Sequence, residues 1–276
     1  MNLSKTILIT GCSSGIGYSA AVLLQNRGHH VIATARNPAD VARLKQEGFT
    51  ALQLDLADSQ SIQQAVSQVL DLTGGTLDAL FNNGAFGQPG AVEDLTRDVL
   101  RYQFEINLFG THELTNRLIP VMRKQGHGRI IYNSSVLGLV AMRYRGAYNA
   151  SKFALEGLAD TLRLELYGTN IHVSLIEPGP ILSHFRENSY ALYKKNIDPA
   201  HSFHQAAYQA MEDRLQKEGA AVAFTLPAKA VVDKVIHALE AKKPKIRYYV
   251  TFPTYLFAVL KRILPISWLD ALLRKV

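Results

Sequence analysis

The sequence has a single cysteine, Cys12, and lacks the residue patterns of several protein classes. One thiol closes no disulfide within the chain and makes no cysteine-based zinc site, so we expect neither a disulfide-stapled secreted scaffold nor a bound metal. The opening MNLSKTILITG contains only a short apolar stretch before glycine, too short for the core of a signal peptide, and we interpret it as a β-strand. These absences favour a cytoplasmic protein.

Charge is not concentrated in any stripe, although the 276 residues carry a net charge of +7. Basic residues are scattered through the first 190 positions, with local concentrations only at residues 242–247 and 261–275. No nucleic-acid-binding motif accompanies them, so we expect no nucleic acid partner. The positive excess suits a nucleotide phosphate or an acidic membrane surface. With 47% hydrophobic residues, the composition is that of an ordinary globular protein.

Short β-branched apolar runs alternate with longer amphipathic segments through the first two-thirds of the chain. This alternation predicts an α/β protein with a doubly wound parallel sheet and helices on both faces, a Rossmann fold. We expect a single domain over residues 1–276, with a substrate-loop insertion at 181–219 and an apolar tail at 248–276. The expected strands are Thr6–Thr10, His30–Ala35, Ala51–Asp55, Asp78–Asn82, Arg129–Asn133 and His172–Ile176. The expected helices are Gly15–Arg27, Pro38–Glu47, Ser59–Leu72, Arg97–Lys124, Tyr148–Tyr167 and Pro227–Ala241.

A glycine-rich turn, Thr10-Gly11-Cys12-Ser13-Ser14-Gly15-Ile16-Gly17, joins the first expected strand to the first expected helix. Glycine allows the backbone to turn tightly and to approach a pyrophosphate, which the amides at a helix amino end can bind. The spacing differs from the G-x-G-x-x-G of ordinary dinucleotide sites. Two alternatives use the same residues: a hydrolase nucleophile elbow, G-x-S-x-G, with Ser13 as nucleophile, and a turn that binds nothing. A P-loop is excluded because Gly-Lys-Ser/Thr is missing.

The second expected strand is followed by Arg36, at the place where an NAD enzyme would carry an acidic residue for the ribose hydroxyls. A guanidinium is the natural partner of a 2′-phosphate, and Ser13 and Thr34 are candidate hydroxyl donors to the same group. The sequence therefore predicts NADP(H) in preference to NAD(H). The alternative is that Arg36 is only a solvated loop cation.

Tyr148 and Lys152 are four residues apart at the start of an expected helix, so they lie on the same face. A nearby ammonium favours the phenolate, and bringing a phenol to near neutrality takes roughly 4 kcal/mol. The pair follows the turn Asn133-Ser134-Ser135, where side chains reach the carboxyl ends of parallel strands. That edge of the sheet is the usual ligand crevice.

Taken together, these motifs resemble the short-chain dehydrogenase/reductases over residues 5 to about 185. The resemblance rests on the glycine turn, Asp55, Asn82-Asn83, Asn107, Ser135, Tyr148, Lys152 and Pro178-Gly179. It extends to the hydroxysteroid and retinol dehydrogenase-like branch, including bacterial NADP-dependent aldehyde reductases. It implies an oxidoreductase that moves a hydride between nicotinamide and a carbonyl or alcohol carbon, and a homo-oligomer, dimer or tetramer, formed through helices 97–124 and 148–167.

The resemblance also implies a role for each matching residue. Tyr148 would be the general acid in reduction or the base in oxidation, and Ser135 would donate a hydrogen bond to the substrate oxygen. Lys152 would hold the nicotinamide ribose and depress the pKa of Tyr148. Asn107 would steady a water linked to Lys152, the alternative being packing at a helix kink. The implied cofactor-binding residues are Gly11, Ser13, Ser14, Gly15, Ile16, Gly17, Arg36, Asp55, Leu56, Asn82, Tyr148, Lys152, Pro178, Gly179, Ile181 and Ser183.

The chain departs from the family pattern at two places. Asn82-Asn83-Gly84-Ala85 stands where the family usually has Asn-Asn-Ala-Gly, which leaves the backbone path there open. Ser183 occupies the slot that is often threonine, so a hydroxyl is retained for the cofactor's carboxamide.

Apolar residues on segments that border the expected site favour a lipophilic aldehyde or ketone as the small-molecule substrate. They are Val136, Leu137, Leu139, Met142, Phe185, Tyr190 and Tyr193. The longest uncharged stretch of the tail, Tyr248 to Leu260, has 13 residues and is too short to span a bilayer. The tail suits packing within the protein or a dimer, peripheral contact with a membrane, or a substrate lid. Two further functions stay open: a non-catalytic NADP(H)-binding sensor and a sugar-nucleotide epimerase.

Overall fold

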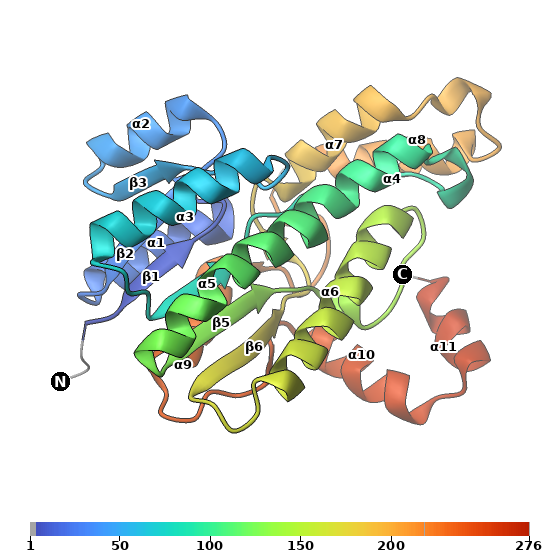
Figure 1. Ribbon diagram of the computed structural model, residues 1–276. Helices are drawn as coiled ribbons and strands as arrows, with labels where there is room; N and C mark the ends of the chain where they lie inside the picture. The colour runs from blue at the N-terminus through green and yellow to red at the C-terminus, as the bar shows by residue number, and fades with distance from the viewer. Residues whose placement is uncertain (1–3, 218, 276) are drawn as a thin grey trace.

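Seven parallel strands form the central sheet of the computed structural model, which describes residues 4–217 and 219–275 (Figure 1). The order across the sheet is β3-β2-β1-β4-β5-β6-β9. Their bounds are β1 Thr6–Ile9, β2 His30–Ala35, β3 Thr50–Gln53, β4 Ala79–Asn82, β5 Gly128–Asn133, β6 Ile171–Glu177 and β9 Arg247–Tyr249. Because the chain reverses its direction of winding between β1 and β4, the carboxyl ends of these two strands flank the switch point where ligands bind in such sheets. The predicted α/β class and doubly wound parallel sheet are confirmed.

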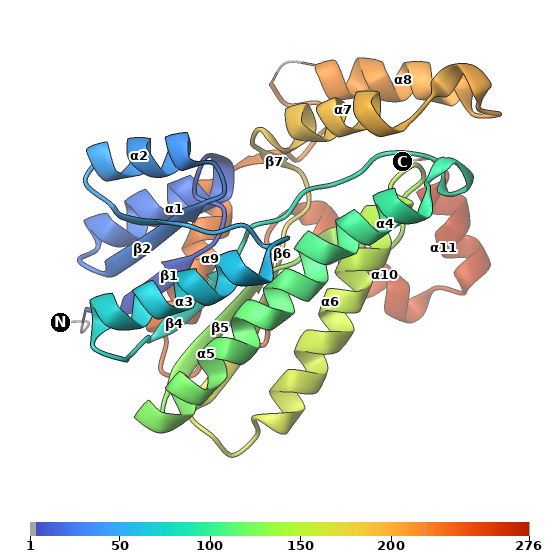
Figure 2. The same cartoon turned by 45° about the horizontal axis from the view of Figure 1, so that its top comes forward.

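Helices cover both faces of the sheet (Figures 1 and 2). On one face, α1 (Gly15–Asn26), α2 (Pro38–Gln46) and α9 (Lys229–Glu240) contribute to one buried cluster, which includes Leu24 and Val235. On the other, α3 (Ser59–Thr73), α5 (Thr111–Gln125) and α6 (Gly146–Glu165) form a second cluster. With both faces covered, nearly every residue of β1, β4 and β5 is buried, which explains why their sequences lack a polar alternation.

The long helix expected over Arg97–Lys124 is not continuous. It is divided into α4 (Arg97–Phe104), a π-helix η2 (Glu105–Gly110) and α5. A π-helix has one residue more per turn than an α-helix, and such segments often occur at functional sites. Apolar periodicity did not reveal this break, because the extra residue only shifts the phase of the pattern.

The region after β6 also differs from expectation. The insertion at 181–219 is mostly helical, with α7 (Phe185–Asn196) and α8 (Gln205–Gln216), and its first residues pair in a two-stranded sheet of β7 (Ile181–Leu182) and β8 (Leu226–Pro227). The tail begins inside β9, which pairs with β6 and was not predicted. It continues as α10 (Phe252–Ile263) and α11 (Ile266–Leu273). Within the described ranges, the model contains no helix with the length and apolar character needed to cross a membrane.

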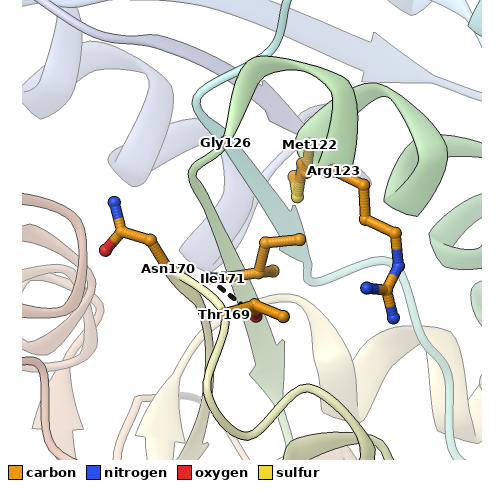
Figure 3. A pocket seen from close by; sticks show the side chains of 6 residues that line it. All are labelled: Met122, Arg123, Gly126, Thr169, Asn170 and Ile171. Carbon is orange, nitrogen blue, oxygen red and sulfur yellow. Dashed lines mark hydrogen bonds between the residues drawn. The ribbon is translucent and has the colours of Figure 1, made fainter.

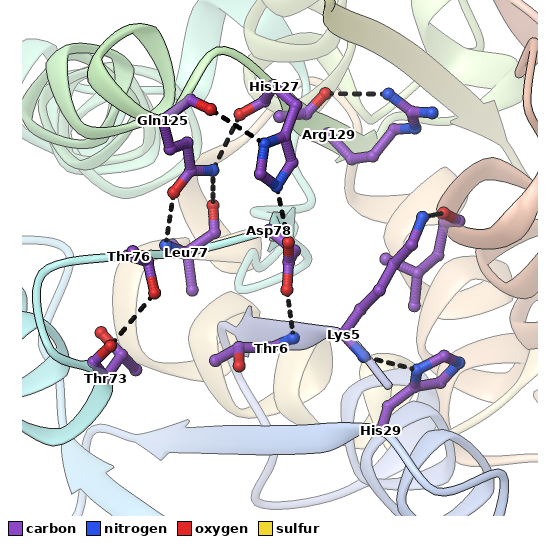
Figure 4. A network of polar contacts seen from close by, with 12 residues as sticks. Lys5, Thr6, His29, Thr73, Thr76, Leu77, Asp78, Gln125, His127 and Arg129 are labelled. Carbon is purple, nitrogen blue, oxygen red and sulfur yellow. Dashed lines mark hydrogen bonds and ion pairs between the residues drawn. The ribbon is translucent and has the colours of Figure 1, made fainter. Parts of the chain in front are cut away.

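Polar contacts join the strand ends at the amino edge of the sheet (Figure 4). Asp78 Oδ2 accepts a hydrogen bond from the amide of Thr6 at 2.7 Å, and Asp78 Oδ1 lies 2.8 Å from His127 Nε2. A hollow of about 230 Å³ lies near the same edge and is lined by Met122, Arg123, Gly126, Thr169, Asn170 and Ile171 (Figure 3). Because ligands of parallel sheets bind at the opposite, carboxyl edge, we assign this edge a structural role.

Candidate active site

A chain of hydrogen bonds connects the carboxyl ends of three neighbouring strands. After β1, the carbonyl of Thr10 accepts from Asn83 Nδ2 at 2.9 Å. Asn83 Oδ1, after β4, accepts from Nδ2 of Asn133 at 2.9 Å, and the carbonyl of Asn133 at the end of β5 accepts from Lys152 Nζ at 2.7 Å. The strand order therefore places Lys152 of α6 and the glycine turn on one continuous framework.

The unusual Asn82-Asn83-Gly84-Ala85 segment has a well-defined backbone path. The hydroxyl of Thr10 accepts hydrogen bonds from the amides of Asn83 at 2.8 Å and Gly84 at 2.7 Å. A Cβ built on Gly84 would lie only 3.1 Å from Leu56 Cδ1, so glycine suits this close approach. The departure from the family pattern is thus accommodated beside the turn.

Tyr148 and Ser135 meet through their hydroxyl groups. Ser135 precedes a short 3₁₀ turn, η3 (Val136–Gly138), and its Oγ accepts from the amide of Leu137 at 3.1 Å. Its hydrogen bond to Tyr148 favours the phenolate, as does the positive charge of Arg145, but burial dominates and raises the pKa of Tyr148 to about 12. The phenol is therefore protonated at neutral pH, which is the form that can protonate a carbonyl oxygen.

Lys152 is buried one turn after Tyr148, with Nζ 5.6 Å from the centre of the tyrosine ring. Burial lowers the pKa of Lys152 to about 8, and the nearby carboxylate of Glu156 opposes that shift. The expectation that Lys152 depresses the pKa of Tyr148 stays a prediction; in this structure its ammonium donates to the carbonyl of Asn133, and burial dominates the pKa of the phenol. Both groups keep the same face of α6, as their spacing predicted.

We expect Lys152→Met to stabilise the fold while removing activity. At neutral pH the buried ammonium costs free energy, so the variant should gain about 1–2 kcal/mol of unfolding free energy after loss of the bond to Asn133. Because the folded-state pKa of Lys152 lies below the ordinary lysine value of 10.5, the wild type should itself gain stability as pH rises above about 8, and the variant should not.

Urea unfolding at several pH values measures this difference. Lys124→Met on the exposed side of α5 is the matched control, and its unfolding free energy should change by less than about 0.5 kcal/mol. A variant at position 152 that is less stable than wild type at neutral pH would contradict the argument.

Asn107 lies in the π-helix η2 and is almost fully buried. Its Oδ1 accepts from the amide of Phe86 at 3.1 Å, and its Nδ2 donates to the carbonyl of Phe86 at 2.9 Å and to Ser151 Oγ at 3.2 Å. The side chain thus fixes η2 against the loop after β4 and against α6. This is the packing role that was left open from the sequence, and the water expected beside Lys152 stays a prediction.

The glycine turn fits a pyrophosphate. Gly11 and Gly15 have positive φ angles of +73° and +59°, and a Cβ on Gly17 would lie 2.1 Å from the carbonyl oxygen of Gly11. The amino end of α1 has no acidic residue in its first turn, and its N-cap residue, Ser14, makes no capping hydrogen bond. In α2 and α3, by contrast, Asn37 and Asp58 cap the first turn. The amides of α1 are therefore available to an anion.

The predicted residues around this turn occupy different environments. Ser183 Cβ would lie 3.3 Å from a Cβ on Gly15, which places the end of β7 beside the turn. Asp55 Oδ1 accepts from the amide of Ala57 at 2.9 Å, and Leu56 is buried against Gly110. Pro178, Gly179 and Ile181 follow β6 directly, at the carboxyl edge of the sheet.

Two residues face away from the crevice. Thr34, a candidate hydroxyl donor, is 1% exposed and donates to the carbonyl of Ile9 at 3.0 Å, so it cannot reach a phosphate outside the sheet. The side chain of Asn82 is also buried and donates to Thr115 of α5 at 3.0 Å. Its contact with an adenosine ribose stays a prediction, and its neighbour Asn83 is the residue whose side chain contacts the glycine turn.

Arg36 is exposed immediately after β2, and its Nη1 lies 3.5 Å from the hydroxyl of Tyr102. The sequence analysis missed a second cation, Arg43 of α2, whose Nη2 donates to the carbonyl of Ser13 at 2.6 Å. Its guanidinium also lies 5.6 Å from the centre of the Tyr18 ring. Arg43 comes seven residues after Arg36. Within one helix this spacing would place both side chains on the same face, but Arg36 precedes α2, so the spacing did not predict that the two cations lie near the same turn.

The surroundings of the Tyr148 ring are apolar and come partly from segments that follow β6. The ring of Phe185 at the start of α7 makes an edge contact with Tyr148, at 5.3 Å between ring centres. Another cluster contains Tyr148, Val136 and residues of both tail helices, among them Phe257 and Leu269. The insertion and the tail therefore each pack against Tyr148.

The model of the short chain dehydrogenase family matches residues 5–193. The chain belongs to this family. A relative, the "Uncharacterized oxidoreductase YbbO" of Escherichia coli K12, is 44% identical to this short chain dehydrogenase over 273 residues, which cover 99% of this chain and 95% of that protein. Human 17-beta-hydroxysteroid dehydrogenase type 1 is 34% identical, over 89% of this chain and 77% of that protein.

A solved short chain dehydrogenase/reductase from Burkholderia phymatum, in complex with NAD, has a TM-score of 0.77 at 24% identity and covers 93% of this chain and 92% of its own. This likeness shows the fold. As a short chain dehydrogenase, the protein is an oxidoreductase that uses a nicotinamide nucleotide and acts on an alcohol or carbonyl group. The resemblance inferred from the sequence is confirmed.

Proposed function

We propose that the protein is an NADP(H)-dependent reductase of lipophilic aldehydes or ketones. The observation that carries the proposal is the hydrogen-bonded pair of Ser135 and Tyr148 beside the buried Lys152, under an apolar cover. Arg43, which contacts the glycine turn, and Arg36 after β2 support a preference for the nucleotide that carries a 2′-phosphate, NADP(H), over NAD(H).

In the proposed reaction, the reduced nicotinamide supplies a hydride to the carbonyl carbon. Tyr148 donates its phenolic proton to the carbonyl oxygen, for which its high pKa keeps the group protonated. Ser135, oriented by the amide of Leu137, donates a hydrogen bond that stabilises the negative charge growing on the same oxygen. Lys152 keeps a positive charge near the phenol, and Asn107 holds α6 and η2 in place.

The apolar contacts around Tyr148 support a lipophilic substrate. Phe185 and the cluster that contains Val136, Leu137 and Phe257 leave mostly hydrocarbon beside the phenol. The name of the human relative, a 17-beta-hydroxysteroid dehydrogenase, refers to a substrate of this kind. An apolar wall binds such molecules by removing their surface from water, at roughly 25 cal/mol per Å².

The test is an assay of purified protein with NADPH and a series of aldehydes and ketones, followed by the loss of the reduced-nicotinamide absorbance. We expect kcat/KM to rise with chain length or ring number, and NADPH to be preferred over NADH. Preference for small polar carbonyls would refute the assignment of substrate class, and absence of turnover with the whole series would refute the reductase assignment.

Removing either arginine should weaken NADPH selectively. For Arg36→Ala and Arg43→Gln we expect KM for NADPH to rise about 10- to 100-fold, since a charge-assisted hydrogen bond contributes about 1.5–3 kcal/mol, whereas KM for NADH should change little. Lys45→Ala, which removes an exposed cation from α2, the helix of Arg43, is the control. Equal losses with both nucleotides would place the arginines outside a 2′-phosphate site.

We further propose that the protein is a cytoplasmic homo-oligomer assembled through α4, α5 and α6. The support is the exposed apolar side chains on and beside these helices, which a subunit contact would cover. They are Leu100, Tyr102, Phe109, Phe153, Leu164 and Tyr167.

A further inference from the structure

The helices α10 and α11 lie outside the two helical layers, at the end of the molecule next to α6 (Figures 1 and 2). They are joined by Leu264 and Pro265, and α10 packs against the η3 turn that follows Ser135. Tail residues therefore form one wall beside Tyr148. The other side of the same pair faces away from the body of the protein.

The pair is apolar on both sides. Its inner side contributes Phe257, Leu260 and Leu269 to the cluster with Val136 and Tyr148. Its outer side exposes eight large apolar side chains, each between 40% and 79% accessible to solvent. These are Phe252, Tyr255, Leu256, Val259, Ile263, Ile266, Trp268 and Leu272. A helix pair that is apolar on its exposed face is normally covered by something.

Charge indicates what covers it. Between residues 251 and 275 there are four basic residues, all exposed, and a single acidic one, Asp270. The basic residues are Lys261, Arg262, Arg274 and Lys275. A second copy docking on this face by two-fold symmetry would bring the same cations against one another. An anionic lipid surface instead matches both the apolar residues and the positive charge.

We propose that α10 and α11 dock on the surface of a bilayer that contains anionic lipids, with their outer residues inserted among the headgroups. Because the inner side of the pair packs in one cluster with Tyr148, docking would place Tyr148 close to the membrane surface and let a membrane-dissolved carbonyl compound reach it without crossing water. The second statement rests on the proposed function, whereas the docking itself does not.

The single tryptophan of the chain makes the test direct, since Trp268 lies on the outer side of α11. Purified protein is mixed with vesicles of phosphatidylglycerol and phosphatidylcholine, or of phosphatidylcholine alone. With the anionic vesicles we expect Trp268 emission to shift to shorter wavelength, to be quenched by brominated lipid, and the protein to float with the vesicles.

Two double variants separate the contributions and keep Trp268. Ile263→Glu/Ile266→Glu should abolish the emission shift and the flotation. Arg262→Gln/Arg274→Gln should lower the partition coefficient about 10- to 30-fold, since each basic residue near an anionic surface contributes about a 5-fold factor. The matched controls are Leu72→Glu on the exposed side of α3 and Lys45→Gln on α2, which should bind as wild type does.

The outcomes distinguish the occupants of the surface. No emission shift with any vesicle, or equal vesicle binding by all variants, would overturn the proposal. An emission shift that depends only on protein concentration and accompanies a doubling of mass would also overturn it, because that result would identify a second copy of the chain as the occupant. Turnover of a short, water-soluble aldehyde should be the same in wild type and Ile263→Glu/Ile266→Glu, while turnover of a vesicle-dissolved substrate should fall only in the variant. If the protein binds vesicles but reduces no carbonyl compound, docking stands and the proposed function fails.

Discussion

Replacing Tyr148 with phenylalanine is expected to lower kcat for carbonyl reduction by about 10²- to 10⁴-fold, the usual contribution of a positioned general acid. The ring and its contact with Phe185 would stay, so the shape of the pocket changes little. What is lost is the phenolic proton, which burial keeps on the oxygen by raising the pKa of Tyr148 to about 12. Steady-state kinetics with a saturating lipophilic aldehyde measures the effect.

Binding of NADPH, measured by fluorescence titration, should change less than about 5-fold in the same variant, because loss of one neutral hydrogen bond contributes about 1 kcal/mol or less. Tyr132→Phe is the matched control, since Tyr132 of β5 is also a buried tyrosine with a hydrogen-bonded hydroxyl, but its hydroxyl contacts Thr115 of α5, at 3.3 Å, instead of Ser135. It should keep full activity. A Tyr148→Phe enzyme with a tenth or more of wild-type kcat would exclude the acid role.

Replacing Arg247 with methionine is expected to lower the free energy of unfolding by about 3–5 kcal/mol, because it leaves buried carboxylates without their cation. Arg247 of β9 pairs with Glu177 at the end of β6 and with Glu156 and Asp160 of α6, the last at 2.6 Å. Glu177 is fully buried and Glu156 nearly so. Urea unfolding measures the loss, with Arg117→Met, which removes an exposed ion pair of α5, as the control.

The pH dependence separates charge from packing in this variant. Burial, reinforced by the nearby Glu156, raises the pKa of Glu177 above its ordinary value, and Arg247 opposes that rise. Without Arg247 the pKa of Glu177 should rise further, so the unfolded state binds fewer protons than the folded state and stability falls as pH rises. Burial already raises the pKa of Glu177 to about 8 in the wild type, so the two proteins bind different numbers of protons only above that pH. The deficit should therefore stay constant between about pH 5 and pH 7 and grow as pH rises through about 8, and Glu177→Gln added to Arg247→Met should remove that growth. A deficit that does not change with pH would indicate lost packing instead.

The sequence was most informative where function requires a fixed residue at a fixed spacing. In the turn, Gly11 and Gly15 have positive φ angles and Gly17 leaves no room for a Cβ beside Gly11, so the glycine pattern predicts both a conformation and a ligand. Tyr148 and Lys152 lie on one face of α6 because the helical repeat demands it. The parallel sheet followed from runs of buried apolar residues separated by amphipathic helices.

Features that depend on tertiary contacts were not predictable. The strand β9 has three residues, fewer than any periodic signal requires, and pairs with β6 from 72 residues further along the chain, as Leu175 opposite Arg247 shows. The π-helix depends on the side chain of Asn107 bonding across to Phe86, a contact without a local pattern. Arg43 likewise contacts Ser13 only after α2 folds back over the turn.

The segments that cover Tyr148 come late in the chain. In the proposed function, Ser135, Tyr148 and Lys152 precede β6, and the nucleotide-binding residues end with Ser183. The helices α7, α10 and α11, which add to the apolar cluster of Val136 and Leu137, follow Ser183. Mutations after Ser183 should therefore alter which molecule is accepted while changing coenzyme binding little. Such an arrangement lets substrate choice drift over evolutionary time at little risk to the chemistry itself.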